Sequence, residues 1–126
     1  MKQSITTKNA PAAIGPYSQA IKTGNFVFLS GQLGINPETG ALVPGLVTEQ
    51  TEQVFKNIRA VLAEENLTLD KVVKTTVFLS DMLDFAAMNE VYANHFQEPY
   101  PARSAVAVKT LPKNALVEIE VIAVTD

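Results

Sequence analysis

Two segments of the chain have the pattern of β-strands with apolar side chains on both faces. Residues 72–80 and 116–124 are rich in valine, isoleucine and threonine, and successive side chains in a strand point to opposite faces. In the first strand, one face carries Val73, Val77 and Leu79, and the other carries Val72 and Phe78. In the second strand, one face carries Val117, Ile119, Val121 and Ala123, and the other carries Leu116 and Ile122. A sheet built from these strands has to be covered on both sides.

The rest of the pattern predicts two helices and about four more strands. Apolar residues repeat at helical spacing over residues 48–65, and again from Asp81 or Asp84 to Phe96, where Pro99 ends the pattern. Shorter strands are expected at residues 2–6, 17–22, 25–31 and 103–109, with a tight turn at Gly24 and a loop over the proline- and glycine-rich stretch 32–46. The predicted fold is therefore a single α+β domain over residues 1–126, with a sheet of about six strands.

Two helices are enough to cover only one face of such a sheet. The opposite face still carries apolar residues, and their exposure to water is unfavourable. We therefore expect a homo-oligomer in which the sheets of neighbouring copies pack against each other.

The composition excludes several classes of function. The chain has 126 residues, no cysteine and a single histidine, which excludes disulfides, cysteine nucleophiles and metal sites built from several histidines. Its net charge of −3 gives no general attraction for nucleic acid. No stretch reaches about 18 apolar residues, and the N-terminus lacks an apolar signal core, so we expect a cytoplasmic protein without a membrane partner.

Arg103 is the first candidate for a functional residue. Arg103 and Arg59 are the only arginines, and Arg103 lies just after Pro101, where a strand of small apolar residues begins. A guanidinium there needs a partner, and its planar fork suits a carboxylate held by two hydrogen bonds. The pattern alone favours a structural ion pair with a carboxylate of the same protein and leaves the carboxylate of a ligand open.

Glu118 and Glu120 share one face of their strand, because they are two residues apart. A carboxylate on a face that meets a neighbouring subunit would be partly desolvated, and its pKa would rise. Such a group suits general acid or base catalysis. The pattern alone favours the plainer alternatives, which are a solvated strand face or a partner for Arg103.

Two glycine-containing bends flank the expected hairpin. Residues 15–18 and 30–32 can expose a hydroxyl and free N–H groups, although turn chemistry alone accounts for both bends. A Ser-His-acid triad at Ser30 would have to use His95. The pattern places His95 late in the second helix, where it is expected to be an ordinary helix-end residue.

Five blocks of sequence form a recognisable pattern. The C-terminal block runs from Pro101 through Arg103 to Val106, continues with Lys109 and Leu111, and ends in residues 117–120. The other blocks are residues 13–20, 28–32, 53–58 and 85–92. Together they resemble the Rid family of reactive intermediate or imine deaminases, which are also called translation inhibitor or endoribonuclease L-PSP proteins. The resemblance covers nearly the whole chain and is to the archetypal deaminase subgroup.

The resemblance implies a fold, an assembly and an activity. The implied fold is chorismate-mutase-like, with a mixed sheet and two helices on one face. The implied assembly is a homotrimer with a central barrel of packed sheets and three sites at the clefts between subunits. The implied activity is that of a 2-iminobutanoate/2-iminopropanoate deaminase, which hydrolyses small carboxylate-bearing imines and enamines such as 2-aminoacrylate to 2-keto acids and ammonia. No metal or organic cofactor is implied, since an imine is already electrophilic.

The resemblance also implies roles for individual residues. Arg103 would anchor the substrate carboxylate, and Glu118 would activate the attacking water or carry its proton. The other implied substrate-binding residues are Tyr17, Ser30, Gly31, Asn89 and Ala105, of which Gly31 and Ala105 would act through the backbone. Many relatives carry cysteine where this chain has Ala105, so a role that depends on a thiol does not transfer to this chain.

Two other classes of function stay open. A non-catalytic trimer that senses 2-keto or imino acids, or a chaperone-like protein, would use the same arginine to hold its ligand. A ribonuclease or translation inhibitor is the third class. The acidic net charge and the lack of a patch that combines basic and aromatic residues argue against nucleic acid as the main partner.

Overall fold

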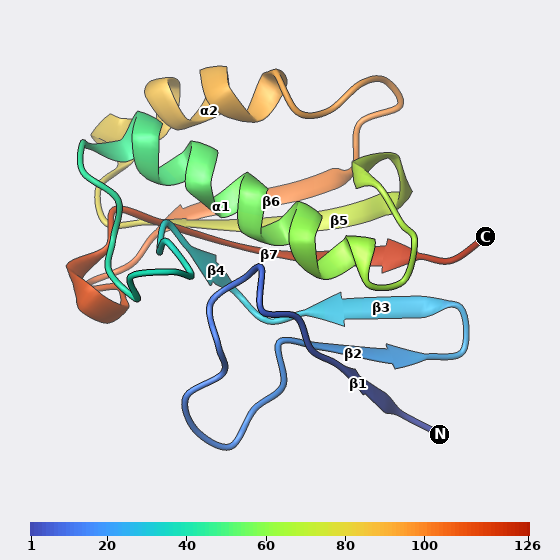
Figure 1. Cartoon of the computed structure of the whole chain (residues 1–126). Coiled ribbons are helices and arrows are strands. Elements are labelled where there is room, and N and C mark those ends of the chain that lie inside the picture. Colours follow the sequence, from blue (N-terminus) through green and yellow to red (C-terminus); the bar gives the residue numbers. More distant parts are fainter.

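In the computed structural model, which describes residues 1–126, one mixed seven-stranded sheet carries two helices on a single face (Figure 1). Strand β7 (Val117–Val124) lies inside the sheet and runs antiparallel to β3 (Phe26–Leu29) and β5 (Val72–Leu79). The order along the sheet is β1 (Gln3–Ile5), β2 (Ala20–Thr23), β3, β7, β5 and β6 (Ala102–Ala107), and β4 (Gln32–Leu33) pairs with β7 where the pairing of β3 has ended. Strand β6 forms one edge and runs parallel to β5.

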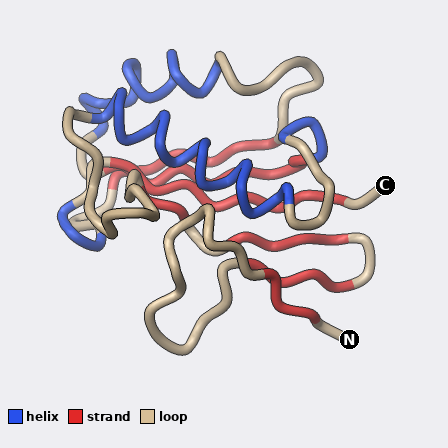
Figure 2. Tube along the Cα trace, viewed as in Figure 1, coloured by secondary structure: helices blue, strands red, loops and turns tan.

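The two helices lie next to each other over the same face, as Figure 2 shows. Helix α1 (Val47–Ala63) begins where the Glu49 carboxylate accepts a hydrogen bond from the Leu46 N–H at 2.8 Å. It is followed by Asn66 at a φ of 58°, a left-handed conformation that ends helices. Helix α2 (Phe85–Ala93) is preceded by a 3-10 turn, whose cap Asp81 accepts a hydrogen bond from the Leu83 N–H. Neither helix is long and apolar enough to cross a membrane.

The core lies between the helices and the face of the sheet that they cover. Its fully buried side chains of valine size or larger come from α1, α2, β3, β5 and β7, because each of these elements turns one apolar stripe or face inward. The largest are Phe55, Ile58, Leu62, Leu79, Met88 and Ile119. This arrangement confirms the predicted α+β fold with both helices on one side.

The opposite face of the sheet carries exposed aromatic and aliphatic side chains. Phe26 and Phe28 on β3 are 47% and 41% exposed, and their ring centroids lie 6.0 Å apart. Val106 on β6 is 46% exposed. Ile122 of β7, which pairs with Phe28, is half-buried. Both faces of the sheet are therefore apolar, as the strand pattern predicted, and no helix covers the second one.

The structure corrects the sequence predictions at two places in the sheet. The stretch 32–46 was expected to be a loop, but its first two residues form strand β4. Val73 was expected to share a face with Val77, but a register shift between Val72 and Lys74 places Val72 in the core and leaves Val73 exposed. The shift gives β5 one extra residue relative to β7, so the side chains of β5 before the shift point to the opposite faces from those that strict alternation predicts.

Candidate functional site

Arg103 lies on the edge strand β6 with its guanidinium against helix α2. Its Nη1 donates a hydrogen bond to the Oδ1 of Asn89 at 2.7 Å, and its Cζ lies 4.7 Å from the ring centroid of Tyr92. The ion pairs of the structure join Lys22 to Glu65 and His95 to Glu52, so no carboxylate of the chain lies within 4.0 Å of the guanidinium. The structural ion pair that the sequence pattern favoured is therefore absent within the chain.

The guanidinium also lines an open hollow of about 490 Å³. The hollow is bounded by Asn89, Tyr92, Ala93, Tyr100, Pro101 and Arg103. Ala105 lies two residues further along β6, on the same face as Arg103, and packs half-buried against the core. Arg103, Asn89 and Ala105 thus form one group, with an unneutralised positive charge facing a space that can take a small anion.

Glu118 lies on β7, on the sheet face that the helices leave open, opposite Leu33 of β4 and Phe78 of β5. Burial raises the pKa of the Glu118 carboxyl, and the neighbouring carboxylate of Glu120 raises this pKa further. The carboxyl therefore holds a proton more tightly than an exposed glutamate does. That property suits a group that accepts a proton from water and returns it to a leaving group.

Gly31 fits directly against the Glu118 side chain. A Cβ at position 31 would collide with Oε2 of Glu118, so this carboxylate can keep its position only beside a glycine. Gly31 also lines a cavity of about 450 Å³, together with Tyr17, Ile14 and Leu33 among others. Gly31 thus lies at the wall of this cavity, with the Glu118 carboxylate packed against it.

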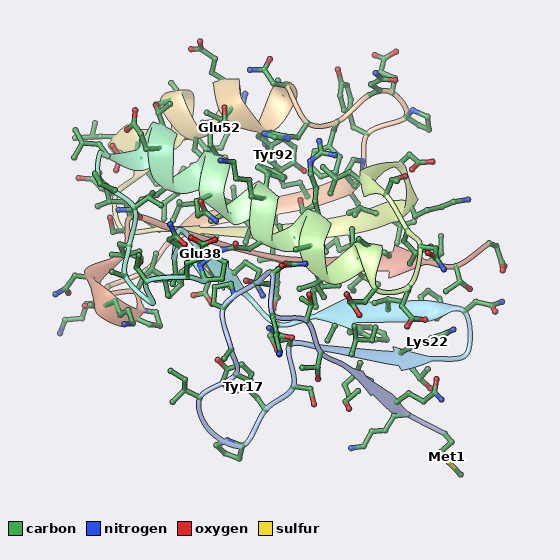
Figure 3. The ribbon with its side chains drawn as sticks, in the orientation of Figure 1. Met1, Tyr17, Lys22, Glu38, Glu52 and Tyr92 are labelled. Atoms are coloured by element: carbon green, nitrogen blue, oxygen red, sulfur yellow. The ribbon has the colours of Figure 1, made fainter.

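Tyr17 and Ser30 lie near this second group. Tyr17 is exposed on the loop between β1 and β2, where its hydroxyl oxygen accepts a hydrogen bond from the Ile14 N–H at 3.4 Å (Figure 3). The Ser30 hydroxyl donates to the carbonyl of Ser18 at 2.6 Å. His95 instead contacts Glu52, so the structure holds no Ser-His pair at Ser30.

The predicted site residues form two groups on opposite faces of the sheet. Arg103 pairs in register with Thr75, which is buried under the helices, whereas Glu118 pairs with Phe78 on the open face. Paired residues of neighbouring strands share a face, and residues 75 and 78 lie on different faces of β5. The structure therefore brings Arg103 together with Asn89, and Glu118 together with Gly31, but it does not bring Arg103 and Glu118 together within one chain.

Comparison with known proteins identifies the family. A sequence profile of the family described as endoribonuclease L-PSP matches residues 7–125. The chain belongs to the endoribonuclease L-PSP family. It is 48% identical to the 2-iminobutanoate/2-iminopropanoate deaminase of Mus musculus, over 98% of this chain and 92% of that protein.

Solved structures of this family share the fold of the chain. A member of the conserved Rid protein family from Yersinia pestis, YyfA, superposes with a TM-score of 0.95 at 53% identity, over 98% of this chain and 99% of that one. The E. coli protein TdcF, solved with bound serine, superposes with a TM-score of 0.92 at 42% identity, over 98% of this chain and 99% of that one. The resemblance to the Rid family and the chorismate-mutase-like α+β fold are both confirmed.

In this member of the endoribonuclease L-PSP family, two residues contact Arg103 that the sequence pattern did not single out. Phe85 and Tyr92 belong to the apolar repeat that predicted the second helix, and both pack against the core. Their rings also lie 5.3 Å and 4.7 Å from the Arg103 Cζ. The sequence feature that could have indicated these contacts is the polar residue Asn89. Phe85, Asn89 and Tyr92 are at positions i, i+4 and i+7 and therefore share one helix face.

Proposed function

We propose that this chain is an imine deaminase, which hydrolyses 2-aminoacrylate, 2-iminopropanoate and 2-iminobutanoate to 2-keto acids and ammonia. The observation that carries the proposal is the Arg103 guanidinium, which faces an open hollow with an amide and two aromatic rings as its neighbours and no carboxylate. A guanidinium in that setting is available to bind the carboxylate of a small ligand by two parallel hydrogen bonds. The name of the mouse relative and the serine bound to the E. coli relative support a small amino-acid-like substrate.

The proposed site is formed between two copies of the chain in a homotrimer. A substrate of three or four carbons is too small to reach from Arg103 to Glu118 of the same chain, because these residues lie on opposite faces of the sheet. The exposed face around Phe26 and Phe28 supplies the apolar area that a second copy would cover. Because Arg103 lies on the edge strand β6, such packing would bring Arg103 of one copy beside Gly31 and Glu118 of the next.

Positioning and proton transfer are the chemistry that these residues would supply. Arg103 would fix the substrate carboxylate and thereby the imine carbon, which lowers the entropic part of the barrier. As water adds to the carbon of the protonated imine, Glu118 would take one of the water's protons, and the carbon would then carry a hydroxyl and a neutral amino group. Glu118 would then give this proton to the amino nitrogen, and the C–N bond would break to release ammonia. The hydroxyl would lose its proton to the Glu118 carboxylate as the C–O bond becomes the carbonyl of the 2-keto acid. The enamine 2-aminoacrylate enters the same sequence after protonation of its terminal carbon gives 2-iminopropanoate.

A coupled assay tests the proposal. A serine dehydratase generates 2-aminoacrylate in the cuvette, and its loss is followed with and without the protein. The wild-type protein should accelerate hydrolysis, and Arg103→Ala should abolish this effect while the oligomer stays intact. Arg59→Ala is the matched control, because Arg59 is the only other arginine and contacts His95 away from the proposed site; it should keep the wild-type rate.

The same assay separates catalysis from ligand sensing. A sensing protein would bind 2-oxobutanoate through Arg103 without shortening the lifetime of any short-chain imine. If the wild-type protein accelerates the hydrolysis of no such imine, the enzyme proposal is wrong.

A further inference from the structure

The Arg103 guanidinium rests on aromatic rings instead of on a carboxylate. Its Cζ lies 4.7 Å from the ring centroid of Tyr92 and 5.3 Å from that of Phe85, both within the distance at which a ring face attracts a cation. A carboxylate in the same place would cancel the positive charge that a ligand carboxylate needs. An aromatic ring holds the guanidinium and leaves its charge and most of its N–H donors free.

A buried hydrogen bond to the sheet holds the Tyr92 ring in place. Its hydroxyl lies 2.8 Å from the Oγ1 of Thr75, and Thr75 is fully buried. Thr75 of β5 pairs in register with Arg103 of β6. Thr75, which anchors the Tyr92 ring, and Arg103, which packs on that ring, are therefore direct neighbours in the sheet. The rings of Phe96 and Phe55 pack against Tyr92 with centroids 4.8 Å and 5.8 Å away and restrict its movement further.

The contacts of Arg103 leave one edge of its guanidinium toward the hollow. Asn89 lies almost one turn before Tyr92 on α2 and accepts a hydrogen bond from Nη1. Helix α2 therefore supplies both the ring beneath the guanidinium and the amide at one corner of it. The remaining donors of the planar fork face the hollow that Tyr100 and Pro101 bound on the other side.

We propose that Tyr92, held by Thr75, is a positioning residue that presents the Arg103 guanidinium to the substrate carboxylate. The inference rests on the proposed function, in which Arg103 binds that carboxylate. Thr75 and Tyr92 then act through Arg103 and do not contact the substrate. A valine and a phenylalanine would fill the same volumes, so the hydrogen bond between Thr75 and Tyr92 serves to orient the ring.

Three variants test the inference through substrate affinity. Tyr92→Leu removes the ring, and Tyr92→Phe keeps the ring and removes the hydroxyl. Val91→Ala is the matched control, because Val91 is buried on the same helix and is not among the contacts of Arg103. Calorimetry measures the Kd for 2-oxobutanoate, and the coupled assay measures KM and kcat. We expect Tyr92→Leu to raise Kd and KM by about tenfold with a smaller loss in kcat, and Tyr92→Phe to raise them by about twofold. Val91→Ala should keep the wild-type Kd and KM.

A merely structural role would give a different result. Loss of folded protein lowers kcat per total protein and leaves KM and Kd unchanged. If Tyr92→Leu does not fold, Phe85→Leu takes its place, since Phe85 is only half-buried at the start of α2 and its ring centroid also lies 5.3 Å from the Arg103 Cζ. We expect Phe85→Leu to raise Kd and KM by about threefold. Unchanged Kd and KM in the folded ring-deletion variants overturn the inference.

The outcomes separate this inference from the proposed function. Wild-type hydrolysis combined with an unchanged KM in Tyr92→Leu overturns the inference alone. Binding of 2-oxobutanoate without any imine hydrolysis overturns the proposed function, and the Kd series still decides whether Tyr92 presents Arg103. A wild-type protein that neither binds 2-oxobutanoate nor hydrolyses imines overturns both.

Discussion

Arg103 and Glu118 lie on opposite faces of one sheet, although the sequence motif places both in a single site. Arg103 shares its face with Thr75, under the helices, and Glu118 shares the open face with Phe78. Arg103 sits on the edge strand and Glu118 on an inner strand, so neither side chain can bend around the sheet to meet the other. A ligand that touches both residues would therefore lie between two copies of the chain, as in the proposed homotrimer.

The open face of the sheet should control assembly and activity together. Phe28→Glu places a charge in the exposed apolar face, and we expect it to convert the oligomer to monomers because burial of that charge is unfavourable. Light scattering during size-exclusion chromatography measures the mass, and activity should be lost with the oligomer. Leu83→Glu is the control, since Leu83 is exposed in the turn before α2 and lies off the sheet. An oligomer of unchanged mass in Phe28→Glu contradicts the proposed interface.

Gly31→Ala should abolish the proposed deaminase activity without unfolding the protein. The new Cβ would meet the end of the Glu118 side chain, which is flexible, so the carboxylate should move while the backbone stays in place. We expect kcat/KM to fall by about a hundredfold, which is the lower range for the loss of a general acid or base.

Gly24→Ala is the matched control for this substitution. Gly24 has a φ of 55°, and a Cβ added there would have no atom within 4 Å, so alanine at this position costs backbone strain alone. It should lower the melting temperature and keep the wild-type kcat/KM. Full activity in Gly31→Ala would show that the position of the Glu118 carboxylate does not matter.

The stability of the protein should depend on the protonation of Glu118. Burial raises the pKa of this carboxyl in the folded chain above its ordinary value of 4.5, so the folded state binds the proton more tightly than the unfolded state does. The free energy of unfolding therefore falls as pH rises from below 4.5 through the folded pKa, and the ionised carboxylate destabilises the fold at neutral pH.

Glu118→Gln removes this titration. In urea denaturation it should be more stable than the wild type at pH 7, and the difference should disappear as the pH falls below 4.5. Glu120→Gln serves as the comparison, because removal of its charge lowers the pKa of Glu118 only in part. An equal stability difference between Glu118→Gln and the wild type at both pH values is the result that this account does not allow.

The sequence was sufficient for the elements that a local pattern specifies. Helix α1 and strands β5 and β7 follow from apolar spacing, which packing against a single core requires. Strand β4 does not follow from any local pattern, since Gln32 and Leu33 lie in a proline- and glycine-rich stretch. The Asn57 side chain holds this segment, with its Nδ2 donating to the carbonyls of Leu33 and Ile35 at 3.0 Å across more than twenty residues of sequence.

The residues of the candidate site likewise differ in whether a local sequence pattern predicts their role. Arg103 could be singled out because a lone arginine at the start of an apolar strand needs an explanation. The role of Tyr92 could not, because the spacing that buries it in the core is the same spacing that places it beneath Arg103. The separation of Arg103 from Glu118 depends on which strand each occupies and on strand register, and a linear motif carries neither.

Mixing two inactive variants tests the shared site most directly. Arg103→Ala and Glu118→Gln are purified, unfolded, combined in equal amounts and refolded together, and mass spectrometry of differently tagged chains verifies that mixed oligomers form. Random mixing in a trimer puts an intact Arg103 beside an intact Glu118 of the neighbouring copy in about a quarter of the sites. We expect about a quarter of the wild-type rate of imine hydrolysis, whereas mixed oligomers as inactive as either variant alone would contradict a site shared between copies.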